Sequence, residues 1–314
     1  MASEQFIVYE GSDGPGNGKH IVFVTGDEEY RSEESMPQLA RILAAHHGFK
    51  CTVLWAINPE TGEIDPQTLD NIPGLEALED ADMMVMFTRF RELPDDQMQR
   101  IIDFTNSGKP MMGLRTATHA FNYVKNPDSP FAKWTCRAEG ETEGGWGRQV
   151  LGETWVNHHG HHNFESTRGV IADGREDCPI VRGCDDIWGP SDVYGLTTLC
   201  GDCSPVIVGH VLVGMDPADE VLTEKEILPV AWTKTYTGET GNTAQVFTTT
   251  MGHSGDLKSA GFRRLCVNAC YWALGMAEQI TADGCVDLVG EYEPNEIGVG
   301  GHKTGLKPAD YALD

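Results

Sequence analysis

The run His20-Ile-Val-Phe-Val-Thr-Gly26 decides the fold class. It is short, apolar and rich in β-branched residues, and it ends at a glycine, so it predicts a buried strand. A helical segment follows, in which Ser35 is a candidate cap, Pro37 lies in the first turn and Gly48 marks the end. A strand, a helix and a second strand at these lengths indicate parallel pairing through a right-handed crossover.

The same rhythm continues further along the chain. Apolar runs predict strands at 50–57, 82–88 and 110–114, with a helix from Leu93 to Gly108 between the last two. Later runs predict strands at 206–212, 228–233 and 244–250, and then a helix over 262–274. The pattern predicts an α/β fold with a doubly wound, mainly parallel sheet and helices on both faces.

The regular pattern divides the chain into three parts. We expect an N-terminal arm (1–19), an α/β domain (20–278) and a C-terminal arm (279–314). Within the domain, residues 125–200 are rich in Gly, His, Asp and Trp and lack clean periodicity. Long irregular segments over a rigid sheet usually carry ligand contacts, so we expect this segment to form the site. The terminal arms are candidates for contacts in a homo-oligomer.

The charge balance excludes several classes of partner. The 314 residues include 23 Lys and Arg and 48 Asp and Glu, a formal net charge of −25. Such a chain is not expected to bind nucleic acid or anionic membranes, which attract positive surfaces. No run reaches the roughly 18 to 20 apolar residues of a membrane span. The first residues lack a signal-peptide pattern, which indicates a cytoplasmic protein, or a periplasmic or secreted one whose leader has been removed.

The turn after the predicted strand 110–114 is the first candidate site. Ligands of open α/β sheets bind at the carboxyl ends of the strands, where the sequence reads Gly113-Leu-Arg-Thr-Ala-Thr-His-Ala-Phe121. The turn would present Arg115 or Thr116 rather than a Ser or Cys nucleophile, which argues against covalent catalysis there. Arg115 could bind a carboxylate, a phosphate or a polarised carbonyl. Alternatively, it pairs internally with an acidic residue.

The densest chemical signal is the turn Asn157-His-His-Gly-His-His-Asn163. Its four imidazoles, together with an Asp and an open water position, could form a catalytic site for a zinc-like divalent ion. Alternatively, the turn lines a sugar pocket by hydrogen bonding and stacking, next to three tryptophans: Trp146, Trp155 and Trp188. No nucleotide cofactor is expected, because the glycines of 11–18 precede the first strand instead of following it.

Other polar residues are weaker candidates. His253, between a late strand and the last helix, could act as a general acid or base, or could be an internally bonded loop residue. Asp192 and Tyr194 lie in the irregular segment. Glu28 follows the first strand and should reach the same sheet edge, although such charge runs usually form solvated loops. The Cys200-Gly-Asp-Cys203 spacing is interpreted as structural, since no second such pair exists.

These pieces, in this order, resemble the ThuA-like (trehalose-utilisation) family of the class I glutamine amidotransferase-like, flavodoxin-like superfamily. The resemblance rests on the first strand, the turn 113–121, Leu151-Gly152 before the His-rich turn, and three later motifs: Pro190-Ser-Asp-Val-Tyr194, Pro229-Val-Ala-Trp-Thr233 and Val246-Phe-Thr-Thr-Thr-Met-Gly-His253. It implies a flavodoxin-like sheet and a small carbohydrate substrate, including oxidised 3-keto sugars. The glutaminase activity of the superfamily is not expected, because Arg115 would stand where its nucleophilic Cys aligns.

The residues and the resemblance together predict a carbohydrate-active enzyme that cleaves a sugar or oxidised glycoside as a hydrolase or lyase. The alternative is a non-catalytic carbohydrate-binding or assembly module on the same fold. For an enzyme, the expected catalytic residues are His253, Arg115, His159 and Asp192, and the expected metal ligands are His158, His161 and His162. The expected substrate-binding residues are Thr116, His119, Trp155, Trp188, Tyr194 and Glu28.

Overall fold

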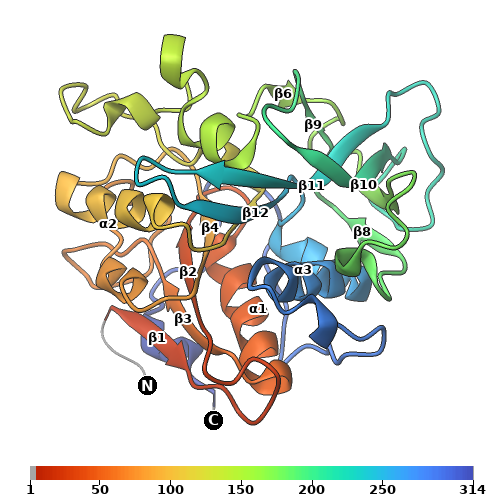
Figure 1. The fold of residues 1–314 in the computed structure, drawn as a ribbon, viewed down its shortest axis with the longest axis horizontal. Helices are drawn as coiled ribbons and strands as arrows, with labels where there is room; N and C mark the ends of the chain where they lie inside the picture. The colour runs from red at the N-terminus through yellow and green to blue at the C-terminus, as the bar shows by residue number, and fades with distance from the viewer. Residues whose placement is uncertain (1–4, 314) are drawn as a thin grey trace.

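The computed structural model describes residues 5–313, which form a ten-stranded sheet with helices on both faces (Figure 1). The strand order is β1-β3-β2-β4-β5-β12-β11-β10-β7-β8. The strands are β1 (Phe6–Tyr9), β2 (His20–Gly26), β3 (Lys50–Leu54), β4 (Met83–Thr88), β5 (Met111–Leu114), β7 (Thr167–Ile171), β8 (Ile187–Gly189), β10 (Ser204–Val211), β11 (Leu228–Thr237) and β12 (Thr243–Thr249). A separate pair consists of β6 (Asn157–His158) and β9 (Tyr194–Gly195).

The parallel part of the sheet confirms the predicted fold class. Strands β3, β2, β4, β5 and β12 pair in parallel, as expected for a doubly wound α/β domain. Beyond β12 the sheet continues with antiparallel neighbours β11, β10, β7 and β8, and β1 adds an antiparallel edge next to β3. The carboxyl ends of β2, β4 and β5 therefore lie at one edge, where the connecting loops can meet.

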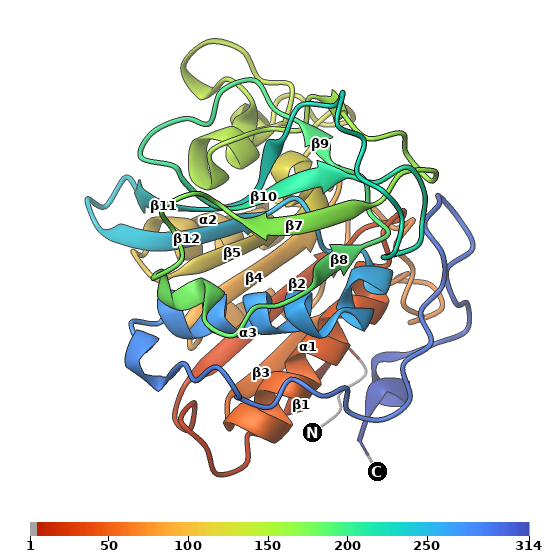
Figure 2. The same cartoon turned by 90° about the vertical axis from the view of Figure 1, so that its right-hand side faces the viewer.

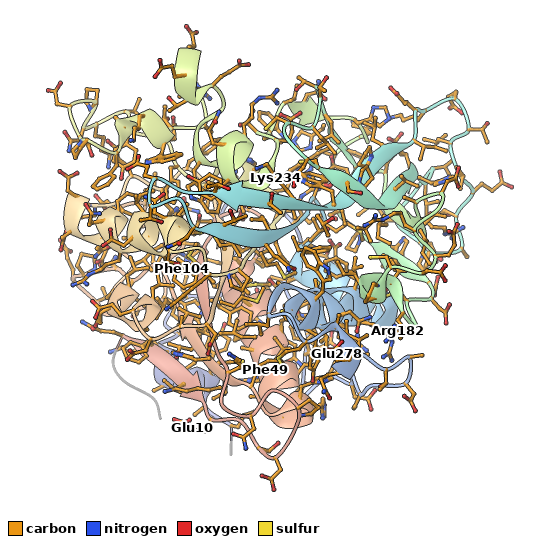
Figure 3. All side chains as sticks on the ribbon, in the orientation of Figure 1. Glu10, Phe49, Phe104, Arg182, Lys234 and Glu278 are labelled. Atoms are coloured by element: carbon orange, nitrogen blue, oxygen red, sulfur yellow. The ribbon has the colours of Figure 1, made fainter. Side chains whose placement is uncertain are left out.

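Three long helices cover the two faces of the sheet. Helices α1 (Ser32–His47) and α3 (Ala260–Ala273) lie on one face and α2 (Asp95–Asn106) on the other (Figure 2). Two apolar clusters fill the spaces between helices and sheet, with Phe49 in the first and Phe104 in the second (Figure 3). The core thus follows the usual layered arrangement of such folds.

Helix α1 begins earlier than predicted. Its first residue is Ser32, so Pro37 lies inside the helix and cannot donate a hydrogen bond to the carbonyl of Glu33 four residues before it. The indole Nε1 of Trp55, at the end of β3, donates to that carbonyl at 3.2 Å. A side chain distant in sequence thereby replaces the missing backbone bond, and the helix extends towards the loop after β2.

Both arms pack on their own chain. The N-terminal arm contributes β1 to the sheet edge, and the backbone N–H of Gly16 donates to the carbonyl of His47 at 2.7 Å. The C-terminal arm passes α1, where Lys303 forms an ion pair with Glu34 at 2.7 Å. Further along, Arg41 donates to the carbonyl of Tyr311 at 2.7 Å. An oligomer formed through these arms stays a prediction.

Among residues 5–313, no helix has both the length and the apolar character that crossing a bilayer requires.

Candidate functional site

The turn after β5 buries Arg115. This residue has a φ of 45°, a strained value for a non-glycine residue, and its side chain is fully buried. Its guanidinium donates to the carbonyl of Thr250 at 2.7 Å, to the carbonyl of Asp192 at 2.6 Å, and to Asp192 Oδ1 at 2.5 Å. The group lies between two aromatic rings, 4.4 Å from the ring centre of Tyr30 and 3.7 Å from that of Tyr194. Of the two alternatives that the sequence left open, the structure shows the internal ion pair, and the Arg115 side chain is not exposed at the surface.

Asp192 is the centre of the polar cluster above Arg115. Its buried carboxylate contacts His158 Nδ1 through Oδ2 at 2.7 Å and His162 Nδ1 through Oδ1 at 3.1 Å. Burial alone would raise the pKa of Asp192, but Arg115 and the hydrogen bonds from the two histidines hold that pKa well below its ordinary range. Asp192 therefore remains a carboxylate and fixes the orientation of both imidazoles.

His162 lies between two carboxylates. Its Nε2 is 3.3 Å from Glu29 Oε1, on the side opposite Asp192. Hydrogen bonds to Asp192 and then to Glu29 raise the pKa of His162 to about 9, so this ring is an imidazolium at neutral pH in the absence of a competing cation. The charge sits close to His158, since the two ring centres are 4.5 Å apart.

His158 has the most exposed side chain of the three cluster residues His158, His162 and Asp192. Its side chain is 31% exposed, and its Nδ1 faces Asp192. When Nδ1 carries the proton, the Nε2 on the far side of the ring is an acceptor available to a ligand. Together, His158, His162 and Asp192 place three potential ligand atoms within 4.8 Å of one another, so this group could hold a metal ion. The nitrogen, nitrogen and oxygen donors suit zinc-like ions.

Aromatic rings form a wall beside His158. The half-buried Trp155 lies 5.6 Å from the His158 ring and 5.5 Å from the His119 ring, measured between ring centres. Tyr194 is 5.6 Å from His158 on the same basis. His119 is buried, and burial followed by Arg89 lowers its pKa well below the ordinary value, which keeps the ring neutral. This wall includes three of the predicted substrate-binding residues.

Thr116 and Glu28 have partners outside the group formed by His158, His162 and Asp192. The hydroxyl of the buried Thr116 donates to the Asp27 carboxylate. Burial, and then the charge of Glu28, raises the pKa of Asp27 to about 6. Glu28 forms ion pairs with Arg89 and, at 2.7 Å, with Arg91. Both predicted substrate-binding residues therefore have internal partners, and their role in substrate binding stays a prediction.

Two histidines of the His-rich turn face away from the cluster. His159 Nε2 bonds the carbonyl of Glu226 at 2.9 Å. His161 is exposed, and its ring stacks on Phe164 with 4.6 Å between ring centres. The structure thus brings together His158 and His162 from the predicted set, and leaves His159 and His161 outside.

His253 and Trp188 lie outside the group formed by His158, His162 and Asp192, although the His253 ring centre is 6.4 Å from that of Tyr30. His253 is buried, its Nδ1 accepts from the Gly255 N–H at 3.0 Å, and its Nε2 lies 3.2 Å from the hydroxyl of Ser254. Burial, followed by the charge of Arg115, lowers the pKa of His253 to about 3, so the ring is neutral and internally bonded. The Trp188 indole donates to Ser166 at 3.1 Å and lines a different groove.

Three residues of this region were not among the predicted site residues, although Glu29 belongs to the charge run after the first strand that was expected at this sheet edge. Glu29 and Tyr30 come from the loop after β2, and the Tyr30 hydroxyl accepts from Arg115 at 3.2 Å and lies 3.4 Å from His162 Nδ1. Arg89 follows β4 directly and holds Glu29 at 3.1 Å. The signal in the sequence was that these residues follow strands predicted to be parallel neighbours. It was weak, because a run of charged residues in a loop more often lies in solvent. The decisive fact is the adjacency of β2, β4 and β5 in the sheet.

No protein-family model and no curated protein sequence matches the chain. One solved structure is that of a protein described as ThuA-like, from Parabacteroides merdae ATCC 43184. It is 16% identical to this chain, and the match covers 94% of this chain and 99% of the other, with a TM-score of 0.48. A second structure with the same description, from Bacteroides uniformis ATCC 8492, is 14% identical. This match covers 83% of this chain and 93% of the other, with a TM-score of 0.48. The chain is thus similar to these two structures over most of its length.

A glutaminase domain from Trypanosoma brucei CTPS is a more distant match. It is 10% identical, with a TM-score of 0.37 over 87% of this chain and 98% of its own. At such identities and TM-scores the likeness concerns the fold alone, and no conclusion about chemistry rests on it.

Proposed function

We propose that the protein is an enzyme that cleaves a sugar or an oxidised (3-keto) glycoside by acid and base chemistry at His158. The observation that carries this proposal is the contact between the buried Asp192 carboxylate and Nδ1 of the partly exposed His158, at 2.7 Å. A carboxylate on one ring nitrogen fixes the tautomer and stabilises the imidazolium, so the other nitrogen can accept a proton from a substrate.

Three features support a carbohydrate substrate. Trp155 presents a half-buried indole beside His158, and indole faces stack against the apolar faces of sugar rings. The chain carries a net charge of −25, which favours neutral over anionic substrates. The sequence resemblance to ThuA-like proteins points to the same class. Because Arg115 stands at the turn where a nucleophile would lie, a covalent glutaminase mechanism is not part of the proposal.

For a 3-keto glycoside the reaction is an elimination. His158 Nε2 takes the proton from C2, which the neighbouring carbonyl acidifies, and the C2–H electrons form a C1–C2 double bond. The glycosidic C1–O bond breaks, and the departing oxygen takes up a proton from the imidazolium just formed. The fixed positive charge of His162, whose ring centre is 4.5 Å from that of His158, would stabilise the enolate oxygen in the transition state. Addition of water to the double bond makes the net result a hydrolysis.

The test compares two histidines of the same turn. The purified protein is incubated with a 3-keto disaccharide and with its unoxidised parent, and released monosaccharide is measured for the wild type, His158→Ala and His161→Ala. Loss of a general acid or base typically costs about 10²- to 10⁴-fold, so His158→Ala should fall by that order while His161→Ala keeps the wild-type rate. Equal rates for both variants would refute the assignment. Calorimetric sugar binding without any product would support the alternative of a non-catalytic binding module.

A further inference from the structure

We propose that His158, His162 and Asp192 bind a divalent transition-metal ion of the zinc type. This inference concerns the site of the proposed function but not the identity of the substrate. An ion ligated by Nδ1 of both rings would take the place of the His162 charge and leave the proton on His158 Nε2, so the metal-bound site and the metal-free acid–base site are alternative states. The three side chains come from separate segments: β6, the turn after it, and the loop before β9. Pairing of β6 with β9 sets His158 opposite Tyr194, two residues after Asp192.

The potential ligand atoms lie close together. Each histidine directs Nδ1 at a different oxygen of the same carboxylate, at 2.7 Å for His158 and 3.1 Å for His162. All three ligand atoms lie within 4.8 Å of one another. An ion bound by the three groups would replace the protons through which the histidines contact Asp192. Two imidazoles and one carboxylate form a donor set of the kind that protein zinc sites use.

The outer partners of the ligands are already in place. Histidines that bind metals usually donate their other ring N–H to a carboxylate, and His162 Nε2 lies 3.3 Å from Glu29 Oε1. Glu29 is itself held by Arg89 at 3.1 Å. Arg115 fixes Oδ1 of Asp192 and leaves Oδ2 directed at His158. A hydrogen-bonded histidine is expected in many polar clusters, but a carboxylate on the far nitrogen of His162 specifically favours ligation through Nδ1.

The cluster is also open to solvent. The side chains of His158 and His162 are 31% and 22% exposed, whereas Asp192 is buried. Three protein ligands leave a further coordination position for water or a substrate oxygen, as in catalytic rather than structural zinc sites. An ion at this position would supply a Lewis acid for a sugar carbonyl.

The decisive experiment measures zinc binding with no sugar present. The chelator-treated full-length protein competes with a chromogenic chelator for Zn²⁺, and Co²⁺ is added separately to record its visible absorption. The wild type should bind one equivalent of Zn²⁺, and bound Co²⁺ should give the intense bands of a low-coordinate site. His158→Ala and His162→Ala should each weaken Zn²⁺ binding by at least about tenfold, and Glu29→Gln by about 10- to 100-fold.

Matched controls come from the same turn and from the cysteine pair. His161→Ala, whose ring stacks on Phe164, should bind Zn²⁺ like the wild type. A Cys200→Ser, Cys203→Ser double variant should do the same. Loss of binding in either control equal to that in His158→Ala would overturn the proposal, as would a wild type that binds no Zn²⁺. Asp192→Asn is a poorer probe, because it leaves the buried Arg115 without its counter-ion.

The proposed function and this inference fail separately. Stoichiometric Zn²⁺ binding that depends on His158 upholds the metal site even if no 3-keto glycoside is cleaved. Cleavage by a protein that binds no Zn²⁺ upholds the function and overturns the metal site.

Discussion

Glu33 provides a stringent test of the interior, because its carboxyl group is buried without compensation. It lies in the first turn of α1 with 4% exposure, and among residues 5–313 neither carboxyl oxygen has a hydrogen-bond partner of good geometry. Burial raises the pKa of Glu33 from 4.5 to about 8, and its own backbone N–H opposes this only in part. The group is therefore protonated in the folded protein at neutral pH and ionised in the unfolded chain.

The sign and size of the effect follow from this difference. Since the folded pKa is the higher one, the stabilisation is complete below pH 4.5 and is lost progressively as the pH rises to about 8. A shift of this size corresponds to an upper value of about 4 to 5 kcal/mol. Glu33→Gln keeps the shape and removes the ionisation. The variant should therefore lack this loss and exceed the wild type in stability at pH 9 by up to that amount.

Urea unfolding at a series of pH values from 5 to 9 measures the effect as a difference between variant and wild type. The difference isolates Glu33 from other groups that titrate in the same range, such as Asp27. The exposed Glu60, changed to Gln, is the matched control and should follow the wild type throughout. A Glu33→Gln protein whose stability falls with pH as steeply as that of the wild type would show that the carboxylate is solvated or paired, and the reasoning would be wrong.

Three further changes test the interior by urea or thermal unfolding. Arg115→Met removes the buried cation beside Asp192 and leaves that carboxylate only its histidine partners, so it should lower the free energy of unfolding by about 3 to 5 kcal/mol; a change below 1 kcal/mol would contradict the buried ion pair. Trp55→Phe removes the donor to the Glu33 carbonyl and should cost about 1 to 3 kcal/mol, and an unchanged midpoint would mean that water takes its place. Gly48→Ala puts a side chain at a φ of 80° against the Ser12 carbonyl, so it should destabilise by more than about 1 kcal/mol, and a neutral result would contradict the tight turn.

The sequence was sufficient for the features that depend on local patterns. Apolar runs located β2, β4 and β5, and Gly48 marked the end of α1, because periodicity and left-handed turns are short-range properties. It failed at the start of α1, where Pro37 indicated the first turn. The compensating donor, Trp55, belongs to another element, and nothing near Pro37 in the sequence announces it.

The site was predictable as a region but not as a set of side chains. The spacing of the His-rich turn does not determine which imidazoles face inward, because His158 and His161 are equally suitable ligands as far as the sequence shows. The choice is made by Asp192, 34 residues beyond His158, and by the β6–β9 pairing that brings it close. Arg115 shows the same limit, since its acidic partner lies 77 residues away.

The position of Arg115 suggests how the site is organised as a whole. The turn after β5 is the place where an open α/β sheet most readily presents a reactive group, but here it carries a buried cation that faces inward. That cation stabilises Asp192 as a carboxylate, and Asp192 in turn orients His158 and His162 at the surface. The strained turn therefore acts on the two imidazoles only through Asp192, and the proposed reactive histidine lies on the irregular segment. Substitutions at Arg115 should then change the orientation of the imidazoles through Asp192, without contacting either histidine.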